Sequence, residues 1–291
     1  MKYGRYSKAL AGDVFLSIDS VIAEYKLQNE GGQRFLHFIE NKLLWQYEYH
    51  EVFGGIGKYQ RCFTFDFGQE STVSVLVGFY GASGRLEPDK VRIDFNPNKV
   101  DCNELRELLV WLRMNAKSSK LVRYDLAVDF PYPRRDFMLV RTDQRKRGLE
   151  ELSQDNFTEY LGRRNCPGRY KLYNKTMESK LEFPLTRSEL TCDGAWSPQM
   201  CLDHFPVLYR FEPFAEDGVK QYVSGSDAAV LAMMIKDPEN SLYLDWFSFR
   251  KRKSLRSILA KCSADSDSVH SVVSVDDIQE IVNRACVDIL S

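Results

Sequence analysis

The chain has 291 residues, of which 44% are hydrophobic and 13% are aromatic, and its formal net charge at pH 7 is −1. A chain of this size can bury a full core in one large or two modest domains. Because the net charge is close to zero, no overall field marks a polyanion as the partner. Any nucleic-acid surface must therefore come from local clusters of Lys and Arg.

Cysteine usage and hydropathy exclude further classes of protein. The seven cysteines include no Cys-x-x-Cys pair, which favours reduced thiols and supports neither a disulfide framework nor a zinc site. The sequence has no recognisable secretory signal, and no window approaches the length of a membrane span. We therefore expect a cytoplasmic protein that does not enter a membrane.

The first hundred residues are expected to be mainly β-strands. Short apolar or alternating runs predict strands at 13–19, 43–49, 60–67 and 71–80. Phe35, Phe38 and Ile39 recur at helical spacing and predict a short helix over 32–42. The glycines at 54–57 are not followed by Gly-Lys-Ser/Thr, so a hairpin connection is favoured over a phosphate loop.

A strand at 90–97 and a helix at 101–117 are predicted next. Alternation places Asp94 on the polar face of that strand, beside Arg92. Asp101 is the candidate N-cap of the helix, with Glu104 completing a capping box, and a stripe of leucines follows.

Asp125 and Asp129 lie on one face of a strand predicted at 121–130, and Tyr124 lies on the apolar face. Two carboxylates on one face of a central strand are costly unless a cation or a metal ion neutralises them. An edge strand with solvated acids, or a salt bridge to Arg123, would also explain the pattern.

The segment 168–178 reads as a strand with a cationic face. Because side chains alternate between the two faces of a strand, four residues share this face: Arg169, Lys171, Tyr173 and Lys175. Tyr170 and Leu172 lie on the apolar face. A tyrosine that attacks a phosphodiester needs a phenol pKa below its usual value of about 10, and neighbouring positive charge favours the phenolate. The alternative is a strand whose Lys and Arg are merely solvated. A further strand at 185–192 places Arg187 and Glu189 on one face.

Four blocks of the chain together resemble a known family. They are Arg123-Tyr124-Asp125-Leu126-Ala127-Val128-Asp129, Tyr160-Leu161-Gly162-Arg163-Arg164, Leu172-Tyr173-Asn174-Lys175-Thr176-Met177-Glu178 and Arg187-Ser188-Glu189-Leu190. In order and spacing they are similar to the blocks of Rep-trans type rolling-circle replication initiators. These initiators occur on small plasmids and have kin in filamentous-phage gene II proteins and conjugative-element relaxases. The resemblance covers roughly residues 90 to 192.

The resemblance implies a nicking enzyme. Tyr173 would be the nucleophile of a DNA nickase and strand transferase that works through a covalent 5′-phosphotyrosine. Lys171 and Lys175 would lower the phenol pKa and help to hold the phosphate. Tyr160 is better suited to stacking a base than to attack. Alternatives are a conjugative or mobilisation relaxase with the same chemistry, and a DNA-binding replication protein without catalysis.

The resemblance also implies a metal ion and a DNA substrate. Asp125 and Glu189 would hold the ion, and Asp129 and Asp94 are further candidate ligands. Since the four histidines form no His-x-His motif, carboxylates would carry the metal, which favours Mg²⁺ or Mn²⁺. The substrate would be a single-stranded or extruded segment at the origin. The candidate backbone contacts are Arg163, Arg164 and Arg169.

The chain after residue 193 changes to helical patterns. Helices are expected at 226–236, 241–262 and 275–290, and the second contains a basic run: Arg250, Lys251, Arg252 and Lys253. This run is either a contact for duplex origin DNA or a solvated helix face. We therefore expect an α+β nicking domain over 1–194, mostly antiparallel sheet with helices on one face, and a smaller helical domain over 195–291. A host helicase and a second copy of the chain are further expected partners.

Overall fold

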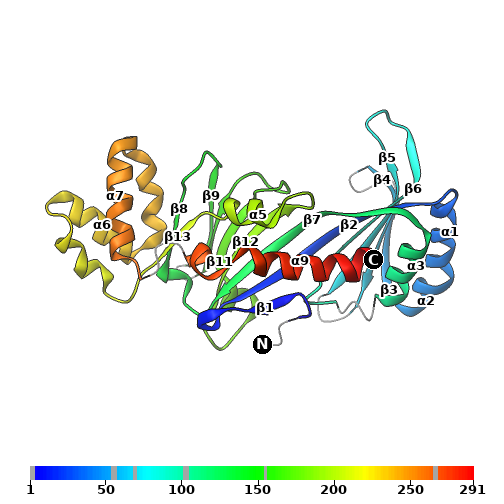
Figure 1. Cartoon of the computed structure of the whole chain (residues 1–291), viewed down its shortest axis with the longest axis horizontal. Coiled ribbons are helices and arrows are strands. Elements are labelled where there is room, and N and C mark those ends of the chain that lie inside the picture. Colours follow the sequence, from blue (N-terminus) through cyan, green and yellow to red (C-terminus); the bar gives the residue numbers. More distant parts are fainter. Residues whose placement is uncertain (1–3, 54–57, 68–70, 101–104, 154–155, 265–267) are drawn as a thin grey trace.

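The computed structural model describes residues 4–53, 58–67, 71–100, 105–153, 156–264 and 268–291 (Figure 1). The capping box predicted at Asp101 and Glu104 and the hairpin connection predicted at 54–57 lie outside these residues. Within the described ranges, no helix is long and apolar enough to cross a membrane.

One large sheet runs through the centre of the molecule. Its strands are β1 (Ser7–Ala9), β2 (Phe15–Leu27), β3 (Glu48–Phe53), β4 (Tyr59–Asp66), β5 (Thr72–Tyr80), β6 (Leu86–Phe95), β7 (Ala116–Phe130), β9 (Arg147–Ser153), β10 (Asn156–Leu161), β11 (Tyr170–Asn174) and β12 (Thr186–Asp193). They lie in the order β3-β4-β5-β6-β2-β7-β12-β11-β10-β9, with β1 beside β2, and neighbouring strands pair antiparallel. The predicted α+β fold with a mostly antiparallel sheet is confirmed.

Helices and a second, smaller sheet complete the fold. The α-helices are α1 (Gly31–Phe38), α2 (Leu44–Gln46), α3 (Arg106–Asn115), α4 (Lys175–Ser179), α5 (Pro198–His204), α6 (Ser226–Lys236), α7 (Phe249–Cys262), α8 (Ser268–Val272) and α9 (Val275–Leu290). The other helical turns are η1 (Ala11–Asp13), η2 (Ile39–Leu43), η3 (Arg134–Asp136), η4 (Ala215–Gln221) and η5 (Pro238–Trp246). The small sheet pairs β8 (Phe137–Val140) with β13 (Val207–Arg210).

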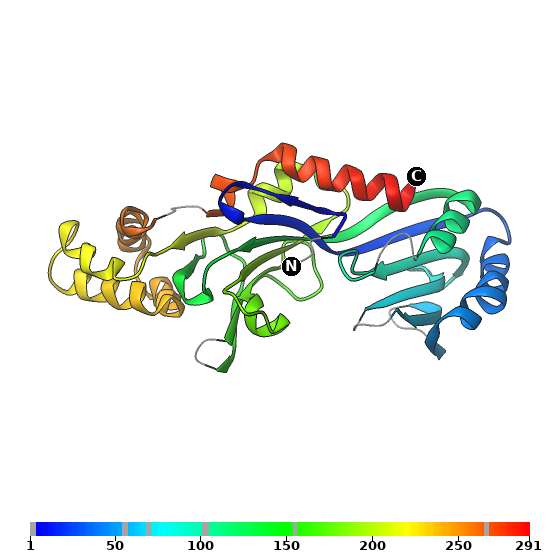
Figure 2. The same cartoon turned by 90° about the horizontal axis from the view of Figure 1, so that it is seen from below.

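The main core lies between the large sheet and α9. Along β7 the alternate residues Tyr124, Leu126, Val128 and Phe130 are buried, as expected for a strand with one apolar face. α9 lies along β2 and β7 (Figures 1 and 2) and buries a stripe at helical spacing: Ile278, Ile281, Ala285 and Ile289. Ser274 and Asp277 form a capping box at its start.

The end of α9 is tied to the N-terminal part of the chain. Asp288 forms a salt bridge with Arg5 at 2.7 Å, and the Tyr25 hydroxyl donates a hydrogen bond to the Ile289 carbonyl at 2.6 Å. The bounds predicted for this helix agree with the structure. Its expected place in a separate helical domain does not, because its apolar stripe is buried on the large sheet.

A second core forms around β8 and β13, at the left end of the molecule in Figure 1. It joins buried residues of the small sheet with residues of η4, α6, η5 and α7, among them Met138, Tyr209, Leu231 and Leu259. β8 precedes residue 194, whereas α5 and α9 follow it and pack on the main core. Residues 195–291 therefore do not form one helical unit as we expected. Elements after residue 194 pack in the main core, and β8, which precedes it, packs in the second core.

Several predicted bounds need correction. The helix expected at 101–117 is α3, which ends at Asn115, and the next strand begins at Ala116 instead of residue 121. The helix expected at 241–262 is two elements, because the chain is extended at Phe247 and the Ser248 side chain caps α7.

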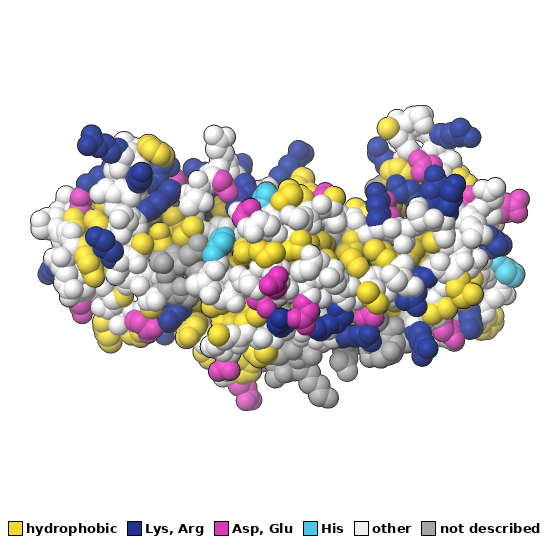
Figure 3. All heavy atoms as spheres, viewed as in Figure 1, with side chains coloured by type: hydrophobic (Ala, Val, Ile, Leu, Met, Phe, Trp, Pro, Cys, Tyr) yellow, Lys and Arg dark blue, Asp and Glu magenta, His cyan; other side chains and the backbone are white. Residues whose placement is uncertain are grey.

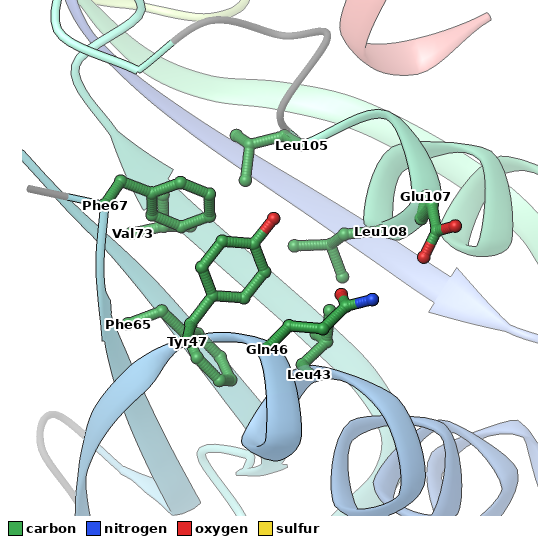
Figure 4. Close-up of a pocket in the computed structure, with 9 residues that line it drawn as sticks. All are labelled: Leu43, Gln46, Tyr47, Phe65, Phe67, Val73, Leu105, Glu107 and Leu108. Atoms are coloured by element: carbon green, nitrogen blue, oxygen red, sulfur yellow. The ribbon is translucent and has the colours of Figure 1, made fainter.

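The opposite end of the molecule holds a small apolar cavity between α2, β4 and α3 (Figure 4). Its volume is about 180 Å³. The Tyr47 side chain points into it with the hydroxyl toward Leu105, and its ring packs on Phe67 at a centroid distance of 4.3 Å. The leucines and phenylalanines around this ring make the cavity part of the packing between helices and sheet.

Candidate functional site

The strand register brings most of the predicted site residues to one face of the sheet. On β12, Arg187 lies opposite Asp129 of β7 and Tyr173 of β11. Glu189 lies opposite Lys171 of β11. These side chains point away from the core that holds Tyr124 and Leu126, since successive residues of a strand alternate between faces.

Tyr173, Lys171, Glu189 and Asp125 are called the Tyr173 cluster below. The Tyr173 hydroxyl donates a hydrogen bond to Oε2 of Glu189 at 3.3 Å. The Lys171 ammonium forms a salt bridge with Oε1 of the same carboxylate. Glu189 and Tyr173 are 3% and 9% exposed, so this charge pair and the phenol are largely shielded from water.

The pKa of Tyr173 is shifted in the direction opposite to our expectation. Burial and the charge of Glu189 raise it well above the usual value of 10. Lys171 does not lower it, because its ammonium is neutralised by Glu189. Burial alone would lower the pKa of Lys171, but the charge of Glu189 outweighs this, and the pKa is raised.

Lys175 lies on a helix and not on the strand where we placed it. β11 ends at Asn174, whose side chain accepts a hydrogen bond from the Met177 amide at 3.1 Å and caps α4. The Lys175 ammonium pairs with Glu178 and lies 5.8 Å from the centroid of the Tyr173 ring. The ammonium thus lies over the Tyr173 ring, but Glu178 on the same helix already neutralises its charge.

Arg187 and Asp19 belong to the same face, and we had not predicted a role for either. Both oxygens of Asp129 accept hydrogen bonds from Arg187, at 2.6 and 2.7 Å, and a third arm of the guanidinium binds Asp19 at 2.7 Å. The pairing of β2 with β7 shifts between Ile18 and Ser20, as at a β-bulge, and Asp19 lies at that shift. An acid at the end of an apolar run was the only sequence signal for Asp19.

Asp125 is the acid that fits a metal ion best, and Glu189, whose two oxygens bind Lys171 and Tyr173, is the acid beside it. Asp125 lies opposite Thr191, two residues along β12 from Glu189, so the two acids are diagonal neighbours on one face. Oδ1 of Asp125 is buried and has no hydrogen-bond partner among the described residues. Burial and the charge of Glu189 raise the pKa of Asp125 to about 6. A cation between the two acids would satisfy the orphaned oxygen and relieve their repulsion.

The structure does not bring the other two candidate ligands into this pair. Both oxygens of Asp129 are bound by Arg187. Asp94 lies on β6, where it forms a salt bridge with Arg92 at 3.4 Å. Among the described residues, no group of three or more His, Cys, Asp or Glu side chains is placed to hold a metal ion. Asp129 and Asp94 are therefore corrected from candidate ligands to ion-pair partners.

A polar cleft of about 420 Å³ opens beside the Tyr173 cluster. Its cationic wall consists of Arg123, Arg164, Arg169 and Lys171. Asp125 and Glu150 also line it. Four cations around an open cleft suit an anionic ligand such as a phosphodiester. Arg163, which we had grouped with Arg164, is exposed on the same turn but does not line the cleft.

Tyr170 lies on the apolar face, as alternation predicted, and Tyr160 lies on the neighbouring strand β10. Tyr160 lies opposite Lys171 and lines the cleft, where its hydroxyl donates a hydrogen bond to Glu150 at 2.8 Å. The Arg169 guanidinium lies 4.4 Å from the centroid of its ring. Tyr170 is fully buried in the main core. Tyr160 is thus the accessible tyrosine of the cleft, while Tyr173 lies deeper.

Comparison with known proteins gives one relative in sequence. A "Replication initiation protein" from Staphylococcus aureus is 24% identical over an alignment of 172 residues that covers 56% of this chain. The chain spans about half the length of that relative, 51%. No family model matches.

The chain resembles a replication initiation protein. Among solved structures, the rolling circle replication initiator protein from Geobacillus stearothermophilus is 12% identical, with a TM-score of 0.39 over 77% of this chain and 97% of that one.

The basic run predicted at 250–253 lies in the first turn of α7. Lys251 pairs with Asp227, and Arg252 pairs with Asp245 at 3.1 Å. Arg250 and Lys253 are exposed and make no ion pair with another described residue. Lys251 and Arg252 therefore form salt bridges within the protein, whereas Arg250 and Lys253 are exposed to solvent.

Proposed function

We propose that the chain is a rolling-circle replication initiator that nicks DNA at its origin through Tyr173. The observation that carries the proposal is the hydrogen bond from the Tyr173 hydroxyl to Glu189, on the face that also holds Asp125. A phenol next to a carboxylate acceptor and an anion-binding cleft is suited to attack on a phosphodiester. The sequence likeness to a replication initiation protein supports the same function.

The nicking step exchanges one phosphate ester for another. The Tyr173 oxygen attacks phosphorus, a bond forms to the 5′ phosphate, and the bond to the 3′ oxygen breaks. Glu189 lies 3.3 Å from the hydroxyl and accepts the phenol proton. A raised phenol pKa makes such a base necessary, because the phenol is neutral at pH 7. The phosphotyrosine stores the bond energy, so the reverse step reseals a strand without an energy source.

Mg²⁺ or Mn²⁺ is the cofactor that we propose. Asp125 would hold it together with Oε1 of Glu189, which is not the oxygen that accepts the hydrogen bond from Tyr173. The unpartnered Oδ1 of Asp125 and the hard oxygen donors suit such an ion. Such an ion would polarise a phosphoryl oxygen and would stabilise the negative charge that develops on the leaving 3′ oxygen. Lys171 is paired with Glu189, so a divalent ion that took over this carboxylate would release the ammonium as a second source of positive charge near the phosphate.

The proposed substrate is a single-stranded or extruded DNA segment. The polar cleft accepts a flexible backbone on Arg164 and Arg169, and Tyr160 offers an aromatic face to a base. A paired duplex could not bring one strand down to the buried Tyr173. A host helicase and a second copy of the chain remain predicted partners, and the nick itself needs neither.

Supercoiled DNA that carries the replication origin of the element encoding this chain provides the test. With Mg²⁺, the proposal predicts relaxed circles and a protein covalently bound to the 5′ end of the nicked strand. Supercoiled DNA that is bound but never nicked would favour the alternative of a non-catalytic DNA-binding replication protein. Nicking at a transfer origin, with no nick at the replication origin, would favour a relaxase.

A further inference from the structure

The end of the molecule farthest from α1 and α3 carries an apolar pocket that nicking does not use. The pocket has a volume of about 570 Å³, within the range of small-molecule sites. α6 contributes Val230, Met233 and Met234, and η5 with the residue after it contributes Tyr243, Trp246 and Phe247.

Aromatic side chains at this pocket are unusually exposed. Trp246 is 81% exposed and Tyr243 is 45% exposed, and their rings meet edge to face at 4.7 Å. Phe249, at the start of α7, does not line the pocket but is also 75% exposed. A cluster of large exposed apolar side chains marks an interaction surface.

The charge beside the pocket indicates what kind of partner it fits. α7 begins three residues after Trp246 and contains six Lys or Arg residues and no acid. Arg250 and Lys253 are exposed and form no ion pair with any other residue that the structure describes. Lys and Arg side chains gather over this end of the molecule in Figure 3. Exposed aromatic rings that are followed in the chain, within four to seven residues of Trp246, by exposed cations suit a polyanion with flat apolar groups.

We propose that this pocket binds an unpaired base of single-stranded DNA, with Trp246 and Tyr243 stacking on the base and Arg250 and Lys253 contacting adjacent phosphates. Single-strand binding proteins combine aromatic stacking with a cationic track in this way. In a duplex the bases are already stacked, so only the phosphate contacts are available. The inference rests on the proposed function to the extent that the ligand is DNA, and it assigns a second single-strand site far from Tyr173.

Binding of a short labelled oligothymidylate without a nick site tests the inference. The parent for this test is the full chain carrying Tyr173→Phe to prevent cleavage and Arg164→Gln with Arg169→Gln to weaken binding in the polar cleft. Trp246→Ala should weaken binding roughly 5- to 150-fold, the loss expected for one stacked base. Trp246→Phe, which keeps an aromatic ring, should retain most of the affinity. Trp45→Ala is the matched control, since Trp45 is 85% exposed but lies on α2, and it should bind like the parent protein.

Two further measurements identify the groups that bind the strand. Arg250→Gln with Lys253→Gln should reduce the slope of log K against log salt by about 0.7 for each phosphate of single-stranded DNA that is no longer neutralised. Trp246→Ala should leave that slope unchanged. Duplex DNA of the same length should bind the Trp246→Ala protein and the parent protein within about twofold, because no base is free to stack.

Equal affinity of the parent and Trp246→Ala proteins for the oligonucleotide would overturn the inference. The exposed apolar pocket would then be assigned to binding of another protein. An equal loss of affinity for single-stranded and duplex DNA would also overturn it. Neither result bears on nicking. A chain that binds through Trp246 but never nicks would instead overturn the proposed function while the pocket assignment stands.

Discussion

The Tyr173 hydroxyl lies 3.3 Å from Oε2 of Glu189 and donates a hydrogen bond to it. This hydrogen bond places a phenol next to a base and, through the same carboxylate, next to Lys171 and Asp125. Burial and the charge of Glu189 hold the pKa of Tyr173 up, so the phenol stays protonated until a proton acceptor and positive charge act together.

Glu189→Gln should lower the pKa of Tyr173 in protein freed of metal. Burial remains in this variant, but the negative charge beside the phenol is gone, so the pKa of Tyr173 falls. NMR of ring-labelled tyrosine, with the signal assigned by Tyr173→Phe, measures the shift. An unchanged pKa would mean that Glu189 does not control the phenol.

Asp125→Asn should stabilise the metal-free protein at neutral pH. The pKa of Asp125 is about 6 in the folded protein, above its usual 3.8. Between these values the folded state holds the extra proton, so the stability of the parent protein decreases as pH rises from about 4 to about 6. Asn carries no charge at any pH, so the stability of the Asp125→Asn protein does not decrease over this range.

The free-energy advantage of Asp125→Asn should therefore grow over that window and then level off at about 2–3 kcal/mol. Chemical denaturation of both proteins in chelator at a series of pH values measures it. Adding Mg²⁺ should stabilise the parent protein and not the variant. An advantage that does not change with pH would contradict the strained carboxylate that we assign to Asp125.

Ile281→Ala should destabilise the whole protein by about 2–5 kcal/mol, because Ile281 is fully buried between α9 and the large sheet. Val287→Ala on the same helix is the matched control. Val287 is 61% exposed, so this change should alter stability by less than about 0.5 kcal/mol. Thermal unfolding followed by near-UV and far-UV signals should show one shifted transition. Loss of helix alone, with the sheet signal unchanged, would contradict the docking of α9.

Neutralising Arg250 and Lys253 should weaken duplex binding and flatten its salt dependence by about 0.9 for each phosphate that the protein no longer neutralises. Lys251 and Arg252 are bound to Asp227 and Asp245, so their neutralisation should change the salt slope less. Binding of a labelled origin duplex over a salt series compares the two pairs of substitutions. An unchanged slope for Arg250 and Lys253 would mean that this part of the run is only a solvated helix face.

Periodicity predicted which residues share a face better than it predicted what they contact. Alternation placed Tyr173 with Lys171 and Glu189 with Arg187, and the strand register agrees. It could not show that Lys171 is neutralised by Glu189, because that pairing depends on which strands become neighbours. The predicted effect on the phenol pKa was therefore wrong in direction.

The sequence also did not predict which distant parts of the chain pack together. The amphipathic pattern of α9 gave its bounds, since the stripe states which residues must be buried. The stripe does not show which surface buries these residues. In the structure the helix packs on β2 and β7, which lie more than a hundred residues earlier in the chain. Asp19 was missed because a shift in strand register, which no alternation pattern reveals, lies between it and the regular strand.

The identity of the nucleophile is tested most directly by isolating the covalent adduct. Parent protein, Tyr173→Phe and Tyr160→Phe are each incubated with Mg²⁺ and a single-stranded oligonucleotide containing the nick site, and the DNA-linked peptide is mapped by mass spectrometry. Each variant removes one hydroxyl from the same sheet face, so each controls for the other. We expect the adduct on the peptide that contains Tyr173, its loss in Tyr173→Phe with DNA binding intact, and its persistence in Tyr160→Phe. An adduct that survives in Tyr173→Phe and maps to Tyr160 would contradict the account, because the accessible tyrosine of the polar cleft would then be the nucleophile.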